Sequence, residues 1–168
     1  ERVFDVIKEL IVANESEKNA SIVILADEDK EEMDDAVAKK FPKAKHTKII
    51  TRDGDTSSLT ELKRVNGPEA KSAIILSSCP DSSSDEEKEI SDTKSIKTIL
   101  ALLGCRNGDN KMTIVAELFS KEKRDLLDSL RFDKVISINS WEILGKLLVQ
   151  TSLSSGLELV YSEILSFK

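Results

Sequence analysis

Short, mostly aliphatic runs alternate along the chain with longer stretches whose apolar positions recur at helical spacing. A continuous aliphatic run of this length is typical of a strand buried in a parallel sheet. The runs predict strands over residues 22–25, 48–50, 73–76, 112–116 and 135–138. The longer stretches predict helices over residues 2–13, 27–40, 57–64, 90–103, 121–130, 141–153 and 157–167.

This order of elements predicts an α/β fold: a Rossmann-like, doubly wound parallel sheet with helices on both faces. We divide the chain into a Rossmann-like lobe, residues 1–140, and a C-terminal helix pair, residues 141–168. The first helix begins at once, without a capping residue, a strand or a glycine-rich turn before it. In a dinucleotide-binding fold that strand is central. We therefore expect a piece of a longer polypeptide, with unpaired backbone groups where the strand would lie.

Composition fits one folded domain and narrows the choice of partners. The 168 residues are 33% charged and 39% hydrophobic, with a formal net charge of −6. An acidic balance argues against a nucleic-acid partner, which needs a basic surface. The apolar runs are all shorter than the roughly 18 residues of a membrane span, so we expect no direct membrane insertion. Cys79 and Cys105 lie far apart, and we expect a reducing, cytoplasmic location.

Asp27 is the first candidate binding residue. It follows a predicted strand and precedes a predicted helix. Dinucleotide-binding folds place there the acid that binds the ribose hydroxyls. The alternative is that Asp27 only caps the helix.

Asp55 is the second candidate, in the segment Arg52-Asp53-Gly54-Asp55 that follows the next strand. The glycine allows a tight turn, and the carboxylate would lie near the adenosine side of a bound nucleotide. A plain turn that leads into a helix cap explains the segment equally well.

Acidic side chains crowd the start of the helix at 27–40, and they give a third candidate. Asp27, Asp29 and Glu31 could gather a divalent cation such as Ca²⁺, which prefers oxygen ligands. The spacing is not that of an EF-hand, so a solvated acidic helix face is the alternative.

Catalytic patterns are weak in this sequence. His46 is the single histidine, and no GxSxG, HExxH or P-loop pattern occurs. We therefore expect no enzyme activity. The segment 78–92 is rich in Ser, Asp and Glu and is expected to be a solvated, mobile loop, with a lid over the sheet edge as a weaker alternative.

Three longer blocks resemble the cytosolic domains of Castor and Pollux ion channels. They are IVILADEDKEEMDD at 22–35, DGDTSSLTELKRVNGPEAKSAIIL at 53–76 and ILGKLLVQTSLSSGLELVYSEILSF at 143–167. Those domains belong to the wider RCK class (regulators of potassium conductance). The resemblance runs from Val3 to Phe167, and the wider class also shows the Gly54-Asp55 turn and the step at 66–70.

The resemblance implies a regulatory lobe on the cytoplasmic side of a membrane, attached to a pore domain of the same polypeptide. Its ligand would be a divalent cation or an adenine dinucleotide. RCK domains pair and assemble into rings, so we expect a homo-oligomer. The interface stripe, which consists of Leu157, Val160, Tyr161, Ile164 and Leu165, suits that contact, although it could instead dock on its own domain. One rival hypothesis is a fragment of a nicotinamide-dependent oxidoreductase, and another is a scaffold that has lost its ligand and retains only the subunit contacts.

Overall fold

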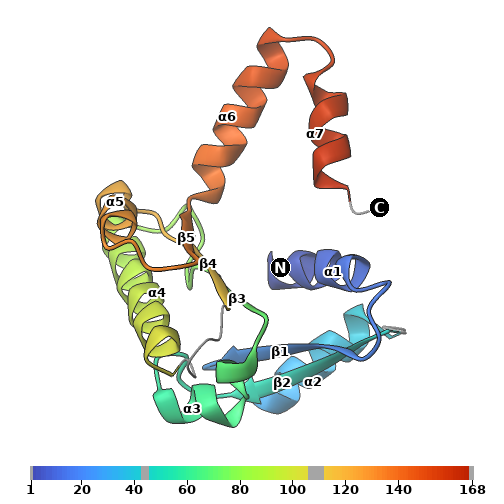
Figure 1. The fold of residues 1–168 in the computed structure, drawn as a ribbon, viewed down its shortest axis with the longest axis vertical. Helices are drawn as coiled ribbons and strands as arrows, with labels where there is room; N and C mark the ends of the chain where they lie inside the picture. The colour runs from blue at the N-terminus through green and yellow to red at the C-terminus, as the bar shows by residue number, and fades with distance from the viewer. Residues whose placement is uncertain (1, 43–45, 106–111, 167–168) are drawn as a thin grey trace.

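The computed structural model describes residues 2–42, 46–105 and 112–166 (Figure 1). The first half of the chain contains α1 (Arg2–Ala13), β1 (Ala20–Ala26), α2 (Lys30–Lys40), β2 (Thr47–Asp53), α3 (Leu59–Arg64), the 3₁₀ helix η1 (Gly67–Glu69) and β3 (Ser72–Ile75). The second half contains α4 (Asp85–Cys105), β4 (Thr113–Glu117), α5 (Lys121–Ser129), β5 (Val135–Ile138), α6 (Ser140–Leu153) and α7 (Leu157–Leu165). The predicted α/β class is confirmed.

The strands pair in parallel, as predicted, but they form two sheets. One sheet has the order β1-β2 and the other the order β3-β4-β5. Among the described residues, β1 and β3 do not pair with each other. The break therefore lies at the position where the sequence predicts a strand to be lacking.

Helices α4 and α5 cover one face of the three-stranded sheet and form the main core with it. Ile99 and Leu102 of α4 and Ile114 and Ala116 of β4 are each at most 4% exposed. Burial of a side chain such as Ile99 is worth about 1.5–3 kcal/mol. These contacts fix the position of α4 relative to the strand ends.

The opposite face of this sheet is partly open, unlike the predicted sheet with helices on both faces. Ile74 on β3 and Ile136 on β5 flank Val115 on β4 in one row. Ile74 is 44% exposed and Ile136 is 49% exposed. Aliphatic strands thus occur here with only one face fully packed.

Helices α2 and α4 begin three and five residues away from their predicted starts, because capping side chains define where they begin. Asp29, not Asp27, caps α2, since its Oδ1 accepts hydrogen bonds from the N–H groups of Glu31 (2.8 Å) and Glu32 (3.1 Å). Helix α4 begins at Asp85 and takes in the second half of the predicted 78–92 loop. The prediction of a loop there was wrong from residue 85 onward.

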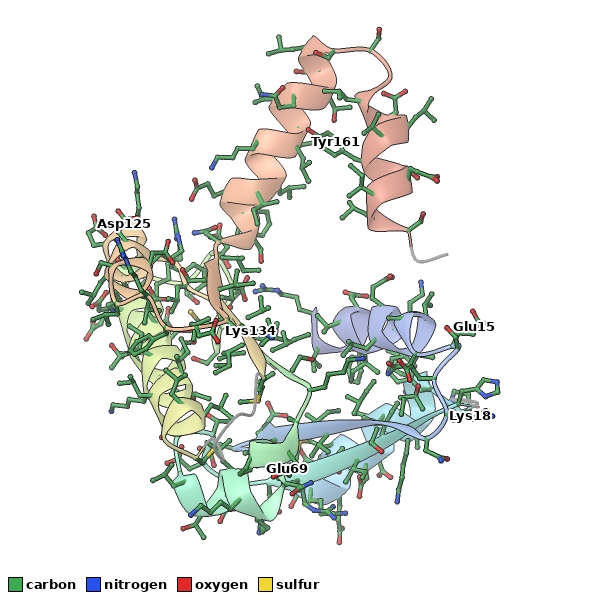
Figure 2. The ribbon with its side chains drawn as sticks, viewed as in Figure 1. Glu15, Lys18, Glu69, Asp125, Lys134 and Tyr161 are labelled. Carbon is green, nitrogen blue, oxygen red and sulfur yellow. The ribbon has the colours of Figure 1, made fainter. Side chains whose placement is uncertain are left out.

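The ends of the chain hold elements that lie apart from the main core. Helix α1 lies above β1, and α6 and α7 form an arm that rises from the end of β5 (Figure 1). Tyr161 is half-buried and points from α7 toward α6 (Figure 2). No helix in the described part of the chain combines the length and the apolar character needed to cross a membrane.

Candidate functional site

The C-terminal ends of β1 and β2 meet at one edge, because the two strands are parallel and in register. Ala26 pairs with Asp53, and the N–H of Gly54 donates a 2.9 Å hydrogen bond to the carbonyl of Ala26. Gly54 has a φ of +150°, and a Cβ at this position would lie 2.8 Å from Oε2 of Glu61. The turn therefore favours glycine, and it holds the residues that follow the two strands side by side.

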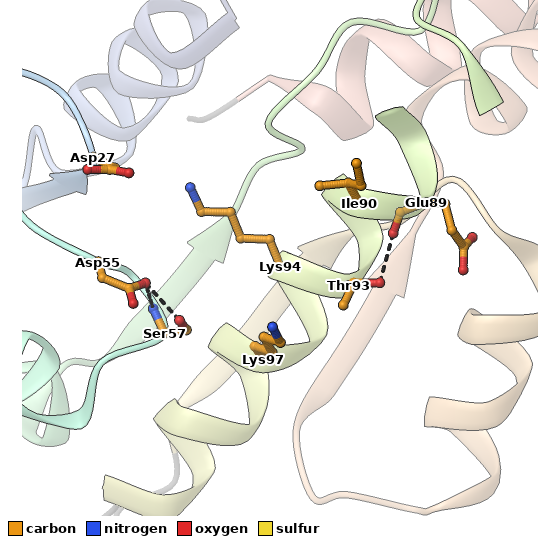
Figure 3. A pocket seen from close by; sticks show the side chains of 8 residues that line it. All are labelled: Asp27, Asp55, Ser57, Glu89, Ile90, Thr93, Lys94 and Lys97. Carbon is orange, nitrogen blue, oxygen red and sulfur yellow. Dashed lines mark hydrogen bonds between the residues drawn. The ribbon is translucent and has the colours of Figure 1, made fainter. Parts of the chain in front are cut away.

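Asp27 and Asp55 line one wall of an open cleft of about 440 Å³ at this edge (Figure 3). Oδ1 of Asp55 accepts hydrogen bonds from the hydroxyl of Ser57 at 2.7 Å and from its N–H at 2.8 Å. These two bonds, and more weakly the charges of Lys94 and Lys97, hold the pKa of Asp55 below its ordinary value. Asp55 is therefore ionised at neutral pH.

The opposite wall of the cleft is one face of α4. It is lined by Glu89, Ile90, Thr93, Lys94 and Lys97. Lys94 extends from α4 toward the two aspartates (Figure 3). Within the described residues, neither Lys94 nor Lys97 takes part in a salt bridge. Carboxylates accept hydrogen bonds from hydroxyl groups and ammonium groups attract phosphates, so the cleft suits a ligand that carries both, such as a nucleotide.

The three candidate cation ligands are not gathered at one point. Asp27 faces the cleft, whereas the Oδ1 of Asp29 is engaged in capping α2. Glu31 lies exposed in the first turn of that helix. Within residues 2–42, 46–105 and 112–166 there is no group of three or more His, Cys, Asp or Glu placed to hold a metal ion.

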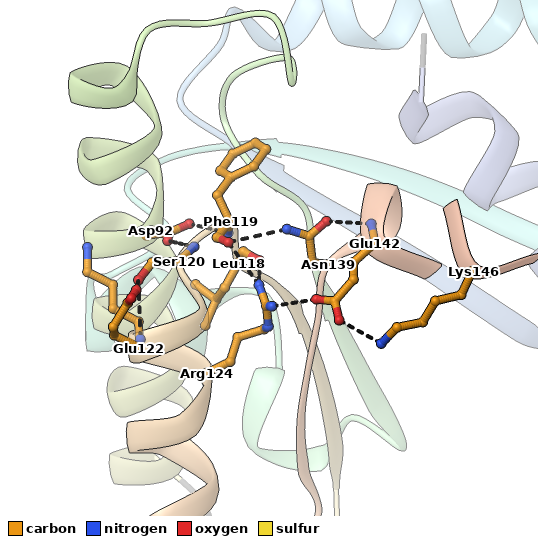
Figure 4. A network of polar contacts seen from close by, with 10 residues as sticks. Asp92, Leu118, Phe119, Ser120, Glu122, Arg124, Asn139, Glu142 and Lys146 are labelled. Atoms are coloured by element: carbon orange, nitrogen blue, oxygen red, sulfur yellow. Dashed lines mark hydrogen bonds and ion pairs between the residues drawn. The ribbon is translucent and has the colours of Figure 1, made fainter. Parts of the chain in front are cut away.

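A polar network joins α4, the segment after β4 and the start of α6 (Figure 4). The carboxylate of Asp92, which is 1% exposed, accepts hydrogen bonds from the N–H groups of Phe119 and Ser120, both at 2.8 Å. Arg124 donates to the carbonyl of Phe119 at 2.9 Å and forms a 2.7 Å ion pair with Glu142 of α6. The loop that follows β4 is thus fixed on two sides.

Glu117, the last residue of β4, is a second buried acid, with a side chain only 4% exposed. It accepts hydrogen bonds from the hydroxyl of Ser140 (2.7 Å), from the N–H of Ser77 (3.0 Å) and from the guanidinium of Arg2. Burial alone would raise the pKa of Glu117, but the hydrogen bonds outweigh it and hold the pKa below its ordinary value. Glu117 is therefore a buried, charged group at neutral pH.

The predicted interface stripe is divided between two environments. Leu157 and Tyr161 are half-buried, whereas Val160, Ile164 and Leu165 are 48%, 71% and 67% exposed. Leu157 and Tyr161 thus pack within the arm itself, and the interface remains a prediction. The remaining apolar surface of the arm is open.

Sequence reasoning missed both lysines of the cleft and both buried acids. Lys94 and Lys97 lie three residues apart in a predicted helix, which places them on one face, but nothing local indicates that this face meets the strand ends. Glu117 had a local signal, since it directly follows the aliphatic run of β4. Asp92 lies where the predicted loop 78–92 and the predicted helix 90–103 overlap, and nothing local indicates that it is buried.

Comparison with known proteins gives the family. Residues 1–136 match the protein family described as "Calcium-activated potassium channel slowpoke-like RCK domain". The chain belongs to the slowpoke-like RCK domain family. The resemblance to the RCK class seen in the sequence is therefore confirmed.

Three curated relatives of this RCK domain, all from plants, carry names of ion channels or probable ion channels. The chain is 29% identical over its whole length to "Probable ion channel POLLUX" of Arabidopsis thaliana and covers 20% of that protein. It is 29% identical to "Probable ion channel CASTOR" of Oryza sativa subsp. japonica, covering 18%, and 28% identical to "Ion channel CASTOR" of Lotus japonicus, covering 19%, each over its whole length. The RCK domain thus spans about a fifth of the length of these relatives.

Proposed function

We propose that this RCK domain is the regulatory part of a Castor/Pollux-like ion channel and senses a ligand in the cleft between the β1–β2 edge and α4. The observation that carries the proposal is the arrangement of charges in that cleft. Asp27 and Asp55 line one wall and Lys94 and Lys97 the other. The likeness of the whole chain to proteins named as ion channels supports the same function.

The cleft is suited to a switch because its two walls belong to different sheets. Asp27 and Asp55 follow β1 and β2, whereas the lysines lie on α4, which packs on the three-stranded sheet. A ligand that contacts both walls binds one spacing of them better than another. It shifts the population of the two arrangements by its difference in affinity.

In this proposal the domain performs no catalysis. It lies on the cytoplasmic side of the membrane, is linked to a pore domain of the same polypeptide, and works as a homo-oligomer through the exposed surface of α6 and α7. The matched family is an RCK domain of potassium channels, and the relatives carry names of ion channels. Both favour this function over an oxidoreductase fragment.

The test is a chimera of the Castor channel of Lotus japonicus whose matched segment is replaced by this chain. Single-channel currents are recorded in a planar bilayer, with NAD⁺ and Ca²⁺ added separately on the side of the domain. We expect NAD⁺ to change the open probability. Combined Asp27→Asn and Asp55→Asn substitutions should raise the NAD⁺ concentration needed roughly tenfold or more, because hydrogen bonds to charged groups are lost.

A control variant, Glu15→Gln, removes an exposed charge outside the cleft and should leave the NAD⁺ response unchanged. The unitary current should be the same in all variants. A response to Ca²⁺ alone that Asp29→Asn weakens would assign the cation site instead. A chimera that opens equally with and without either ligand would contradict the proposed function.

A further inference from the structure

The arm formed by α6 and α7 is attached to the lobe mainly by polar contacts of its first turn. Neither α6 nor α7 contains a buried residue. Asn139 caps α6 by accepting from the N–H of Glu142 at 3.0 Å and donates to the carbonyl of Phe119 at 3.2 Å. Ser140 donates to Glu117. A small number of hydrogen bonds therefore sets the direction in which the arm leaves the lobe.

One of these bonds is shared with the other end of the chain. Oε1 of Glu117 accepts from both Ser140 and Arg2, and Arg2 also donates to the hydroxyl of Ser77 at 3.1 Å. Arg2 belongs to α1, whose Phe4 ring lies 6.2 Å from the ring of Phe41 at the end of α2. Glu117 thus connects the helix over the two-stranded sheet with the base of the arm.

We propose that Glu117 is a junction that couples the position of α1 to the direction of the α6–α7 arm. Arg2 supplies a full positive charge to a carboxylate that is almost completely buried. When α1 moves away, the carboxylate loses its charge-assisted partner, and a buried charge without such a partner is costly. Glu117 then turns toward water and releases Ser140, so the first turn of α6 loses one of its attachments to the lobe.

The coupling works in both directions. A displacement of the arm removes Ser140 from Glu117 and weakens the hold on Arg2 by the same free energy, as linkage requires. This device is a property of the chain itself and does not depend on the proposed channel function. Its test therefore needs neither a ligand nor a pore.

The test measures amide hydrogen exchange by NMR at Glu142 and Ile143, whose N–H groups are bonded to Asn139 in the first turn of α6. Arg2→Gln removes the charge that α1 presents to Glu117. We expect exchange at these two amides to become roughly tenfold faster, the effect of losing one hydrogen bond to a charged group. The control Lys8→Gln, an exposed charge on the same helix, should leave the exchange unchanged.

A second variant distinguishes coupling through Glu117 from a general loss of stability of the chain. Ser140→Ala should speed exchange at the same amides, and adding Arg2→Gln to it should change the rate by less than about twofold, since coupled effects are not additive. The amide of Ile114 in β4, bonded to Lys134 at 2.8 Å, serves as reference and should not change. Three results would each overturn the proposal. The first is equal exchange rates in Arg2→Gln and Lys8→Gln, and the second is additive effects of Arg2→Gln and Ser140→Ala. The third is an equal rise in the exchange rate at Ile114.

Discussion

Glu117 illustrates how one side chain can be both buried and charged. Its carboxylate is compensated by donors from three separate segments: the helix that contains Arg2, the residues after β3 that contain Ser77, and the start of α6 at Ser140. The folded pKa lies below the ordinary value, so the ionised form is the one that the fold stabilises. The contribution to stability is therefore present above the unfolded pKa and is lost as the pH falls through the folded pKa.

Because the pKa of Glu117 is lowered in the folded state, the chain should lose stability at acidic pH. The free energy of unfolding, measured by urea denaturation, should fall as the pH drops below about 4.3, the ordinary pKa of a glutamate. In Glu117→Gln the fall should be shallower. At pH 7 the variant should be less stable by about 1.5–3 kcal/mol, the range for hydrogen bonds to a charged group.

Glu86→Gln, which changes an exposed acid on α4, provides the matched control. It should follow the wild-type pH profile. If Glu117→Gln were to retain the full acid-dependent loss, the buried carboxylate would not be its source.

Residues near each other in the sheet were easier to foresee than residues brought together by packing. The neighbourhood of Asp27 and Asp55 follows from two consecutive parallel strands, whose carboxyl ends share an edge. Lys94 joins them only because α4 packs against β4 through Ile99 and Leu102, which is a long-range contact. The local pattern therefore predicts one wall of the cleft and not the other.

At the scale of elements, α4 is the helix whose start differs most from the one that the apolar residues predict. Its first turn consists of acidic residues, so hydrophobic periodicity gives no signal before Ile90. The start is instead fixed by a capping box: the N–H of Ser84 donates to Glu87 at 2.9 Å, and the N–H of Glu87 donates to the hydroxyl of Ser84 at 3.3 Å. The strands had stronger local signals, and the strand at 135–138 was predicted with its observed bounds.

Ser84→Ala should therefore destabilise the chain by about 1 kcal/mol, the usual cost of losing such a cap. Urea denaturation followed by circular dichroism measures this cost. Ser82→Ala, an exposed serine in the preceding turn, should be neutral. Equal stability of the two variants would mean that α4 is held by its core contacts alone.

At the scale of the whole molecule, the main features are the division of the strands into two sheets and the arm formed by α6 and α7. The strands are divided into two sheets joined by helix contacts such as α3 against α4, and the arm extends beyond the lobe (Figure 1). The sequence predicted the parallel pairing, because the aliphatic runs are local. The division between β1 and β3 lies where the order of elements predicts a strand to be lacking, and no single aliphatic run predicts it.

The open surface of the arm leads to the last prediction, that the chain self-associates. Leu148, Leu153, Leu159 and Ile164 are between 64% and 76% exposed, and they lie on two helices in contact with each other. Large exposed apolar side chains gathered in one part of a protein are typical of interaction sites. Sedimentation velocity should show a dimer or larger species at micromolar concentration.

Ile164→Asp should weaken the association at least roughly tenfold, because a charge would be buried in an apolar contact. Leu126→Asp, on the exposed face of α5 and 57% exposed in the native chain, is the matched control and should associate like the wild type. A monomer at all concentrations would contradict the predicted interface. Equal weakening by both variants would show that charge, and not the arm, controls association.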